Sequence, residues 1–176
     1  MNILDIGCGK EKYPGSIGVD ISDKTDADVI HDLNTIPYPF DDNTFDCIIC
    51  DNVIEHLDDV IKTMDKLWRI SKNGARIKIS VPYFRSVYAS IDPTHQHFFT
   101  YNSFYYFDER HIFNKLYKYS DSIFEVEKVS FDESISSNVL HKCIKYIANK
   151  RPQFYEINIS HLFPLNELTF HLKTIK

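Results

Sequence analysis

Residues 4–9 read Leu4-Asp-Ile-Gly-Cys-Gly9, and residues 17–21 read Ile17-Gly-Val-Asp-Ile21. Both stretches contain a short apolar run that is typical of a buried strand. The first run ends in Gly-x-Gly, where the backbone can approach a ligand closely because no Cβ intrudes. The second run ends in an acid, which offers a carboxylate to the hydroxyls of a ribose. Together they predict a nucleoside-cofactor site at the carboxyl ends of parallel strands.

The pattern of apolar residues predicts the other elements outward from this pair. Further strands are expected over residues 27–31, 46–50, 75–81, 124–131 and 166–175, and helices over residues 54–70, 138–150 and 152–162. The last strand is expected to lie antiparallel beside residues 124–131. Asn52 and Glu55 form a candidate capping box for the first helix, and Asn73-Gly74 is its candidate stop signal. Strands that alternate with helices predict an α/β fold with a mostly parallel sheet.

The connection between the first two strands is unusually short. Only ten residues, 7–16, join the two apolar runs. A crossover that includes a helix needs at least about 10–12 residues. We therefore predict a loop or a single turn there, with no helix.

Charge is distributed unevenly along the chain. The 176 residues carry a net charge of −5, but residues 1–60 carry −11 and residues 61–176 carry +6. The acidic part suits a cationic ligand, and the basic part suits an anionic acceptor or partner; charge scattered over solvated surfaces is the alternative. The chain is 43% hydrophobic and 26% charged, which excludes a disordered protein. No nucleic-acid-reading module is present in the sequence.

The cysteines and the N-terminus favour a cytoplasmic location. Cys47 and Cys50 form a CxxC pair, but positions i and i+3 of a strand face opposite sides, so the pair is not expected to share a metal or a disulfide. With Cys8 and Cys143 they are expected to be free thiols of the core in a reducing compartment. The N-terminus lacks the basic segment of a secretory signal, and no apolar run reaches the ~18 residues of a membrane span.

The glycine pattern distinguishes two kinds of nucleoside cofactor. A dinucleotide fingerprint requires a third glycine that opens a helix, and an acid about 20 residues further on. Lys12 occupies the third position here, and Asp20 lies 13 residues after Gly7. S-adenosylmethionine, which carries a sulfonium and an ammonium and no phosphate, fits an acidic site better.

These motifs resemble those of the class I S-adenosylmethionine-dependent methyltransferases, in particular the small-molecule group called type 11. The resemblance extends over nearly the whole chain and adds His31-Asp-Leu33, the segment 45–57, Ser71-Lys-Asn-Gly74 and His97-Phe-Phe-Thr100. It implies a single domain, 1–176, with a Rossmann-like sheet of seven strands, mostly parallel with an antiparallel C-terminal strand, and helices on both faces. The short first crossover and the missing N-terminal helices leave one side open, or covered by a second subunit of a homo-oligomer.

The resemblance also implies a set of cofactor-binding residues. They are Asp5, Gly7, Cys8 and Gly9 in the first motif, Asp20 and Ile21 in the second, Asp32 and Leu33 in the third, and Asp51 and Asn52 in the fourth. Asp20 would accept hydrogen bonds from the ribose, Asp32 and Leu33 would read the adenine, and Asp5 would orient the ammonium. Each acid alone is also a plausible cap for a turn or helix. Four acids at successive strand ends favour a ligand.

Catalytic residues are expected in the loop after the fifth strand. His95 is the candidate base, Asp92 is its neighbour, and Tyr83 is a candidate to flank the methyl group or the acceptor. Asp92, His95 and His97 could also form a metal site, but three short-range ligands alone are a weak signal, and we predict no metal site. The predicted activity is methylation of a small or medium-sized acceptor on oxygen or nitrogen. A non-catalytic binding module and a dinucleotide enzyme are the alternatives.

Overall fold

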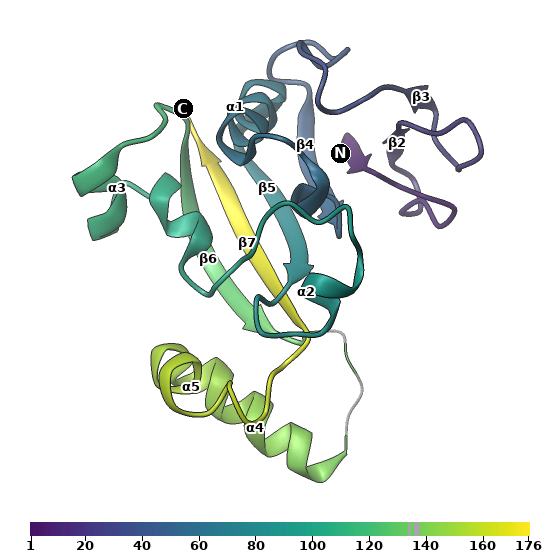
Figure 1. The fold of residues 1–176 in the computed structure, drawn as a ribbon. Helices are drawn as coiled ribbons and strands as arrows, with labels where there is room; N and C mark the ends of the chain where they lie inside the picture. Colours follow the sequence, from purple (N-terminus) through teal and green to yellow (C-terminus); the bar gives the residue numbers. More distant parts are fainter. Residues whose placement is uncertain (134, 136–137) are drawn as a thin grey trace.

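The computed structural model describes residues 1–133, 135 and 138–176 of the chain (Figure 1). The strands are β1 (Ile3–Ile6), β2 (Ile17–Asp20), β3 (Val29–Ile30), β4 (Phe45–Asp51), β5 (Ser71–Pro82), β6 (Ile123–Phe131) and β7 (Glu167–Ile175). The helices are η1 (Ile54–His56), α1 (Val60–Ile70), α2 (Tyr88–Ile91), η2 (Ser103–Phe107), α3 (Ile112–Tyr117), α4 (Val139–Lys150) and α5 (Pro152–Asn158), of which η1 and η2 are 3₁₀ helices. All seven predicted strands are confirmed.

The seven strands form one sheet in the order β3-β2-β1-β4-β5-β7-β6. The first five strands run parallel, and β7 lies antiparallel between β5 and β6, with Phe170 opposite Ile79. The mostly parallel sheet with an antiparallel C-terminal strand is therefore confirmed. The ten residues between β1 and β2 form turns without a helix, as their length predicted. Figure 1 shows the N-terminal strands joined by loops.

One face of the sheet carries the hydrophobic core. The register places Leu4, Ile48, Ile77 and Leu172 side by side on adjacent strands, and none of the four is more than 1% exposed. Phe104 of η2 stacks edge-on against Phe170, with ring centroids 4.7 Å apart, so η2 covers this face. Helix α1 adds the fully buried Met64 and Leu67 to the same cluster. Burial of this apolar surface is the main stabilising force of the fold.

The opposite face is more open, which refines the expectation of helices on both faces. The same register aligns Cys47, Arg76, Lys173 and Glu125 across β4, β5, β7 and β6. Arg76 is exposed and the other three are half-buried. The short crossovers before β4 contain no helix that could cover this face of the sheet. The strands carry charged residues on this face instead.

The segment after β4 differs from its prediction. A single helix over residues 54–70 was expected, but the chain forms η1 and then α1, which begins at Val60. Asp59 is the N-cap, and its carboxylate accepts from the backbone N–H of Lys62 at 2.9 Å. The predicted Asn52–Glu55 capping box is therefore wrong. The predicted stop at Asn73-Gly74 is also wrong, because α1 ends at Ile70 and both residues lie in β5.

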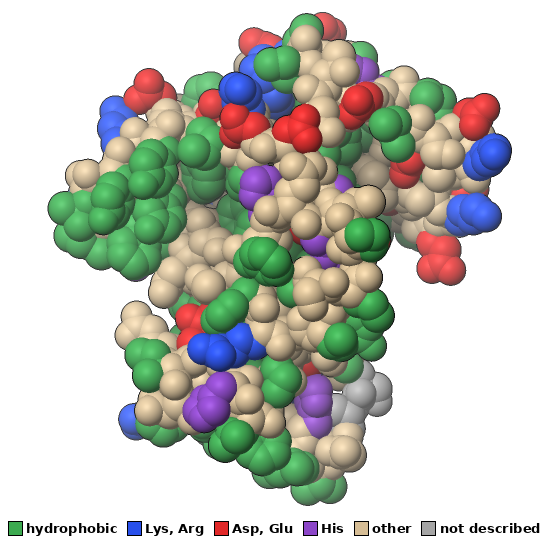
Figure 2. All heavy atoms as spheres, viewed as in Figure 1, with side chains coloured by type: hydrophobic (Ala, Val, Ile, Leu, Met, Phe, Trp, Pro, Cys, Tyr) green, Lys and Arg blue, Asp and Glu red, His purple; other side chains and the backbone are tan. Residues whose placement is uncertain are grey.

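The helices that follow β6 agree better with the sequence. Asn138 caps α4 by accepting from the backbone N–H of His141 at 2.9 Å, and Pro152 begins α5. Figure 1 shows both helices beyond the ends of β6 and β7, and Figure 2 shows hydrophobic side chains gathered over the region of α3. Cys8, Cys47, Cys50 and Cys143 are all free thiols, but only Cys8 and Cys50 lie in the core as expected, whereas Cys47 is half-buried and Cys143 is exposed. Among the described residues, no helix combines the length and apolar character that a membrane crossing requires.

Candidate functional site

The Gly7 turn joins β1 to the loop that precedes β2. Gly7 has a φ of +63° and donates its N–H to Val19 O at 2.7 Å, while Gly9 donates its N–H to Asp20 Oδ2 at 3.1 Å. A Cβ on Gly7 would lie 2.3 Å from Cγ2 of Val53. The turn therefore needs glycine both for its left-handed backbone and for its close contact with the segment after β4.

A nucleoside-sized cavity of about 480 Å³ opens beside this turn. Its lining consists of Gly7, Asp20, Ile21, His31, Asp32, Leu33, Asn34, Asn52, Val53, His56, Leu57 and Thr94. We call it the nucleoside cavity. Six of the ten predicted cofactor residues line it: Gly7, Asp20, Ile21, Asp32, Leu33 and Asn52. The structure thus brings together the ends of β1, β2, β3 and β4.

The remaining predicted residues lie outside the lining. Asp5 is 5% exposed and its Oδ2 accepts from the backbone N–H of Tyr13 at 2.7 Å, so it anchors the loop before β2. Burial raises the pKa of the Asp5 carboxyl above its usual range. Cys8 is buried, and Asp51 is exposed with its carboxylate accepting from Asn52 Nδ2 at 3.2 Å. Gly9 contacts Asp20 and positions that carboxylate instead of lining the cavity.

The charges of the nucleoside cavity decide which cofactor fits. Asp20 and Asp32 place two carboxylates in its wall, and no Lys or Arg is among the described residues that line it. The Gly7 turn also leads into a loop, so no helix N-terminus is available to hold a diphosphate. These residues fit a cofactor with ribose hydroxyls and positive charge, such as S-adenosylmethionine, and not a dinucleotide.

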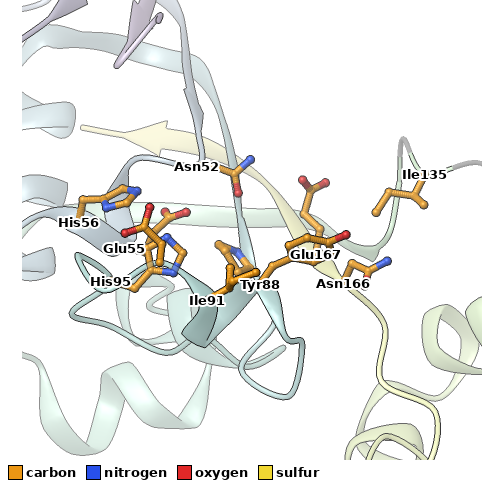
Figure 3. Close-up of a pocket in the computed structure, with 11 residues that line it drawn as sticks. Asn52, Glu55, His56, Tyr88, Ile91, His95, Ile135, Asn166 and Glu167 are labelled. Carbon is orange, nitrogen blue, oxygen red and sulfur yellow. The ribbon is translucent and has the colours of Figure 1, made fainter. Parts of the chain in front are cut away.

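A second cavity of about 620 Å³ adjoins the first (Figure 3). Its lining consists of Asn52, Glu55, His56, Pro82, Tyr88, Ile91, Asp92, His95, Ile135, Asn166 and Glu167. We call it the His–Glu cavity. Asn52 and His56 line both cavities. A ligand in one therefore lies next to a ligand in the other.

Glu55, His56 and His95 form a cluster in the wall of the His–Glu cavity. Figure 3 shows the three side chains pointing toward one another from η1 and from the loop after α2. One ligand-type atom of each lies within 4.8 Å of those of the others. Glu55 is 0% exposed, and neither carboxylate oxygen has a hydrogen-bond partner among the described residues. Because burial disfavours its charged form, the pKa of Glu55 is raised to about 7.

Hydrogen bonds to three successive backbone carbonyls join the two segments that carry this cluster. Gln96 donates its N–H to Glu55 O at 2.8 Å, and its Nε2 donates to His56 O at 2.9 Å. His97 Nε2 donates to Leu57 O at 2.7 Å. The loop over residues 92–97 is thus fixed against η1, and His97 has a structural role there.

The three predicted catalytic residues have different positions. His95 and Asp92 line the His–Glu cavity as expected. Tyr83 is 0% exposed and packs in the core against Phe131 and Tyr155, so it lines neither cavity. Glu55 and His56 lie in η1, shortly after the end of β4, but the helix pattern assigned Glu55 to a cap.

The chain is similar to proteins of one family. Residues 4–79 match a family model described as a methyltransferase domain. A 48-residue segment is 40% identical to an uncharacterised protein of Methanocaldococcus jannaschii; the match covers 27% of this chain and 21% of that protein. The chain therefore matches about a fifth of the length of this curated relative.

Solved structures share the fold over almost the entire chain. A SAM-dependent methyltransferase from Archaeoglobus fulgidus is 21% identical, with a TM-score of 0.60, and the match covers 98% of this chain and 85% of that one. A Haloferax volcanii methyltransferase, solved in complex with the Trm112 methyltransferase activator, is 15% identical with a TM-score of 0.62, over 99% of this chain and 83% of that one. The chain therefore has the fold of the S-adenosylmethionine-dependent methyltransferases, and its N-terminal part, residues 4–79, matches the methyltransferase-domain model.

Proposed function

We propose that the chain binds S-adenosylmethionine in the nucleoside cavity and transfers its methyl group to a small acceptor in the His–Glu cavity. The observation that carries this proposal is the wall of Asn52 and His56 that both cavities share. A cofactor and an acceptor held on either side of this wall would react within one complex and would not have to find each other in solution. Such positioning can supply about 7–11 kcal/mol of a reaction barrier.

Each wall of the nucleoside cavity has a proposed partner on the cofactor. Asp20 accepts from the ribose hydroxyls, because Gly9 and Ser22 already fix its carboxylate through N–H bonds of 3.1 and 2.9 Å. Asp32 and Leu33 contact the adenine. The Gly7 backbone and Asn52 border the methionine end, which directs the sulfonium toward the His–Glu cavity.

The chemistry is an in-line displacement at carbon. A lone pair of the acceptor oxygen or nitrogen forms the new bond to the methyl carbon, and the carbon–sulfur electron pair returns to sulfur. This step neutralises the sulfonium and leaves S-adenosylhomocysteine. The acceptor proton passes to His95 as base, whose Nδ1 is held by Ala89 O at 3.2 Å.

The His–Glu cavity favours a different acceptor from the one the charge split suggested. Glu55, Asp92 and Glu167 line it, and none of its described lining residues is Lys or Arg. A small anion would meet three carboxylates without a basic partner. We therefore propose a neutral or cationic acceptor for the cavity in its metal-free form.

Calorimetric titration with S-adenosylmethionine, S-adenosylhomocysteine and NAD tests the cofactor. We expect both adenosyl compounds to bind and NAD not to bind. Asp20→Asn should weaken both adenosyl compounds by about 10- to 100-fold, since a hydrogen bond to a charged group contributes about 1.5–3 kcal/mol. The matched variant Asp23→Asn, whose side chain is exposed and lies outside the cavity, should bind like wild type. Failure of both adenosyl compounds to bind would overturn the proposal.

Transfer is tested separately from binding. A panel of hydroxyl and amine acceptors is incubated with cofactor that carries a labelled methyl group. We expect label to appear in at least one acceptor and His95→Asn to slow its transfer while cofactor affinity is kept. Tight cofactor binding with no transfer to any acceptor would instead favour a non-catalytic binding module.

A further inference from the structure

The side chains of Glu55, His56 and His95 form one compact cluster, in which the two imidazole rings contact each other edge-on with centroids 4.6 Å apart. Their ligand atoms lie within 4.8 Å of one another, yet no hydrogen bond or ion pair joins the three in the part of the chain that is described. A fully buried carboxylate without a donor is costly, because burial removes its water and nothing replaces it. We infer that these three residues bind one divalent transition-metal ion, with its open positions facing the His–Glu cavity.

The hydrogen bond of His95 prepares its ring for a metal. Its Nδ1 lies 3.2 Å from the carbonyl oxygen of Ala89. A carbonyl only accepts, so Nδ1 carries the proton, and in the neutral ring Nε2 keeps its lone pair. Metal-ligating histidines usually donate their second ring N–H to a carbonyl or carboxylate in this way.

His56 reaches the same tautomer through two hydrogen bonds. The Thr94 hydroxyl lies 2.7 Å from Asp92 Oδ1, and the ionised carboxylate can only accept, so Thr94 donates its single proton to it. The Thr94 oxygen then accepts from His56 Nδ1 at 2.8 Å. Nε2 of His56 is left without a proton. Asp92 thus acts as a positioning residue for the proposed site.

The donor set indicates which ions fit. One carboxylate oxygen and two imidazole nitrogens suit Zn²⁺ better than Mg²⁺, which prefers oxygen ligands. Three protein ligands leave at least one position open, as in catalytic zinc sites. The bonds of Gln96 to Glu55 and His56 hold the two ligand segments together before an ion arrives.

The ion would define the acceptor class, and this step rests on the proposed function. A metal with an open position in the His–Glu cavity would bind an acceptor hydroxyl and lower its pKa, so that the proton would leave to solvent. In this metal-bound form His95 would be a ligand, and the role of base proposed for it above would apply to the metal-free form alone. The charge of the ion also offsets the carboxylates of the cavity. The expected acceptor is then a small molecule with a hydroxyl beside a second metal-binding oxygen.

Zinc titration of protein freed of metal with EDTA tests the site without any methyl acceptor. We expect one Zn²⁺ per chain in calorimetry, and at least about 100-fold weaker binding in Glu55→Gln and in His95→Asn. His161→Asn, which removes an exposed histidine outside both cavities, is the matched control and should bind like wild type. Circular dichroism establishes that each variant is folded.

The outcomes separate this inference from the proposed function. Wild type that takes up no Zn²⁺, or a folded Glu55→Gln variant that binds as wild type does, would overturn the metal site. S-adenosylmethionine titration of the same samples reports on the nucleoside cavity alone. Zinc binding without S-adenosylmethionine binding would keep the metal site and reject the methyltransferase proposal.

Discussion

The nucleoside cavity and the His–Glu cavity adjoin each other but are built in different ways. Most of the nucleoside cavity comes from turns at the ends of β1, β2, β3 and β4, where backbone groups and short side chains meet. The His–Glu cavity takes its lining from four separate parts of the chain, at residues 52–56, 82–95, 135 and 166–167. The first depends on local backbone conformation, and the second depends on long-range contacts between loops.

Gly7→Ala should lower the stability most, because it changes a backbone position on which the nucleoside cavity depends. The left-handed φ of +63° costs an L residue about 1–2 kcal/mol, and the Cβ contact of 2.3 Å with Val53 adds about 1–3 kcal/mol of overpacking. We expect a loss of about 2–5 kcal/mol in the free energy of unfolding. Urea denaturation measures it, and cofactor affinity should fall with it.

Two further variants separate the two causes. Gly15→Ala also places a Cβ at positive φ, +79°, but meets no atom within 4 Å, so it should lose only about 1–2 kcal/mol. Combining Gly7→Ala with Val53→Ala should recover part of the loss relative to Val53→Ala alone. Equal losses for Gly7→Ala and Gly15→Ala would show that the contact with Val53 does not matter.

The sequence predicts the nucleoside cavity well because its signals are local. Gly7 and Asp20 each follow an apolar run directly, and a buried parallel strand carries them to the same edge of the sheet. The Glu55 cluster has no such signal. Asn52-x-x-Glu55 matches a helix cap, and only the fixed path of residues 92–97 shows that Glu55 faces His95.

Glu55→Gln tests the His–Glu cavity by a pH-dependent effect of up to about 3 kcal/mol. The pKa of Glu55 rises from 4.5 to about 7 on folding, so the neutral form is favoured in the fold. The stability that this contributes is complete below pH 4.5 and is lost as the pH rises through 7. In EDTA at pH 8 the amide, which stays neutral, should therefore be more stable than wild type by up to about 3 kcal/mol.

Urea denaturation at pH 4.5 and pH 8, both in EDTA, measures the difference. The two proteins should be closest in stability at the lower pH. Saturating Zn²⁺ at pH 8 should reverse the order, because an ion that binds only folded wild type adds to its stability. Parallel pH curves for the two proteins in EDTA would show that Glu55 is not desolvated in the fold.

The aromatic segment after β5 shows a second limit of sequence reasoning. Residues 83–124 contain 14 of the 25 aromatics, and periodicity does not tell which of them line a pocket. Tyr88 lines the His–Glu cavity, whereas Tyr83, five residues earlier, lies in the core. Phe99 and Phe104 stack there with ring centroids 5.7 Å apart. Burial separates these roles, and burial depends on the packing of α5 and β6 against the segment.

Tyr83→Phe should have the smallest effect, because its hydroxyl has no hydrogen-bond partner among the described residues. Removing an unpaired buried hydroxyl leaves the ring packing intact and should change stability by less than about 1 kcal/mol. Tyr155→Phe is the matched comparison. The Tyr155 hydroxyl donates to Phe163 O at 3.0 Å and accepts from the backbone N–H of Leu165 at 2.7 Å, so its loss should cost about 1–3 kcal/mol.

Methyl transfer by Tyr83→Phe should match wild type in kcat and KM, since neither cavity reaches the ring. This measurement distinguishes a packing role of Tyr83 from the role at the methyl group that the sequence predicted. A residue that flanks the transferred methyl group would change kcat when its hydroxyl is removed, with no change in stability. A kcat that falls tenfold or more in folded Tyr83→Phe would place Tyr83 at the reaction after all, and the His–Glu cavity would have to extend into the core beneath α2.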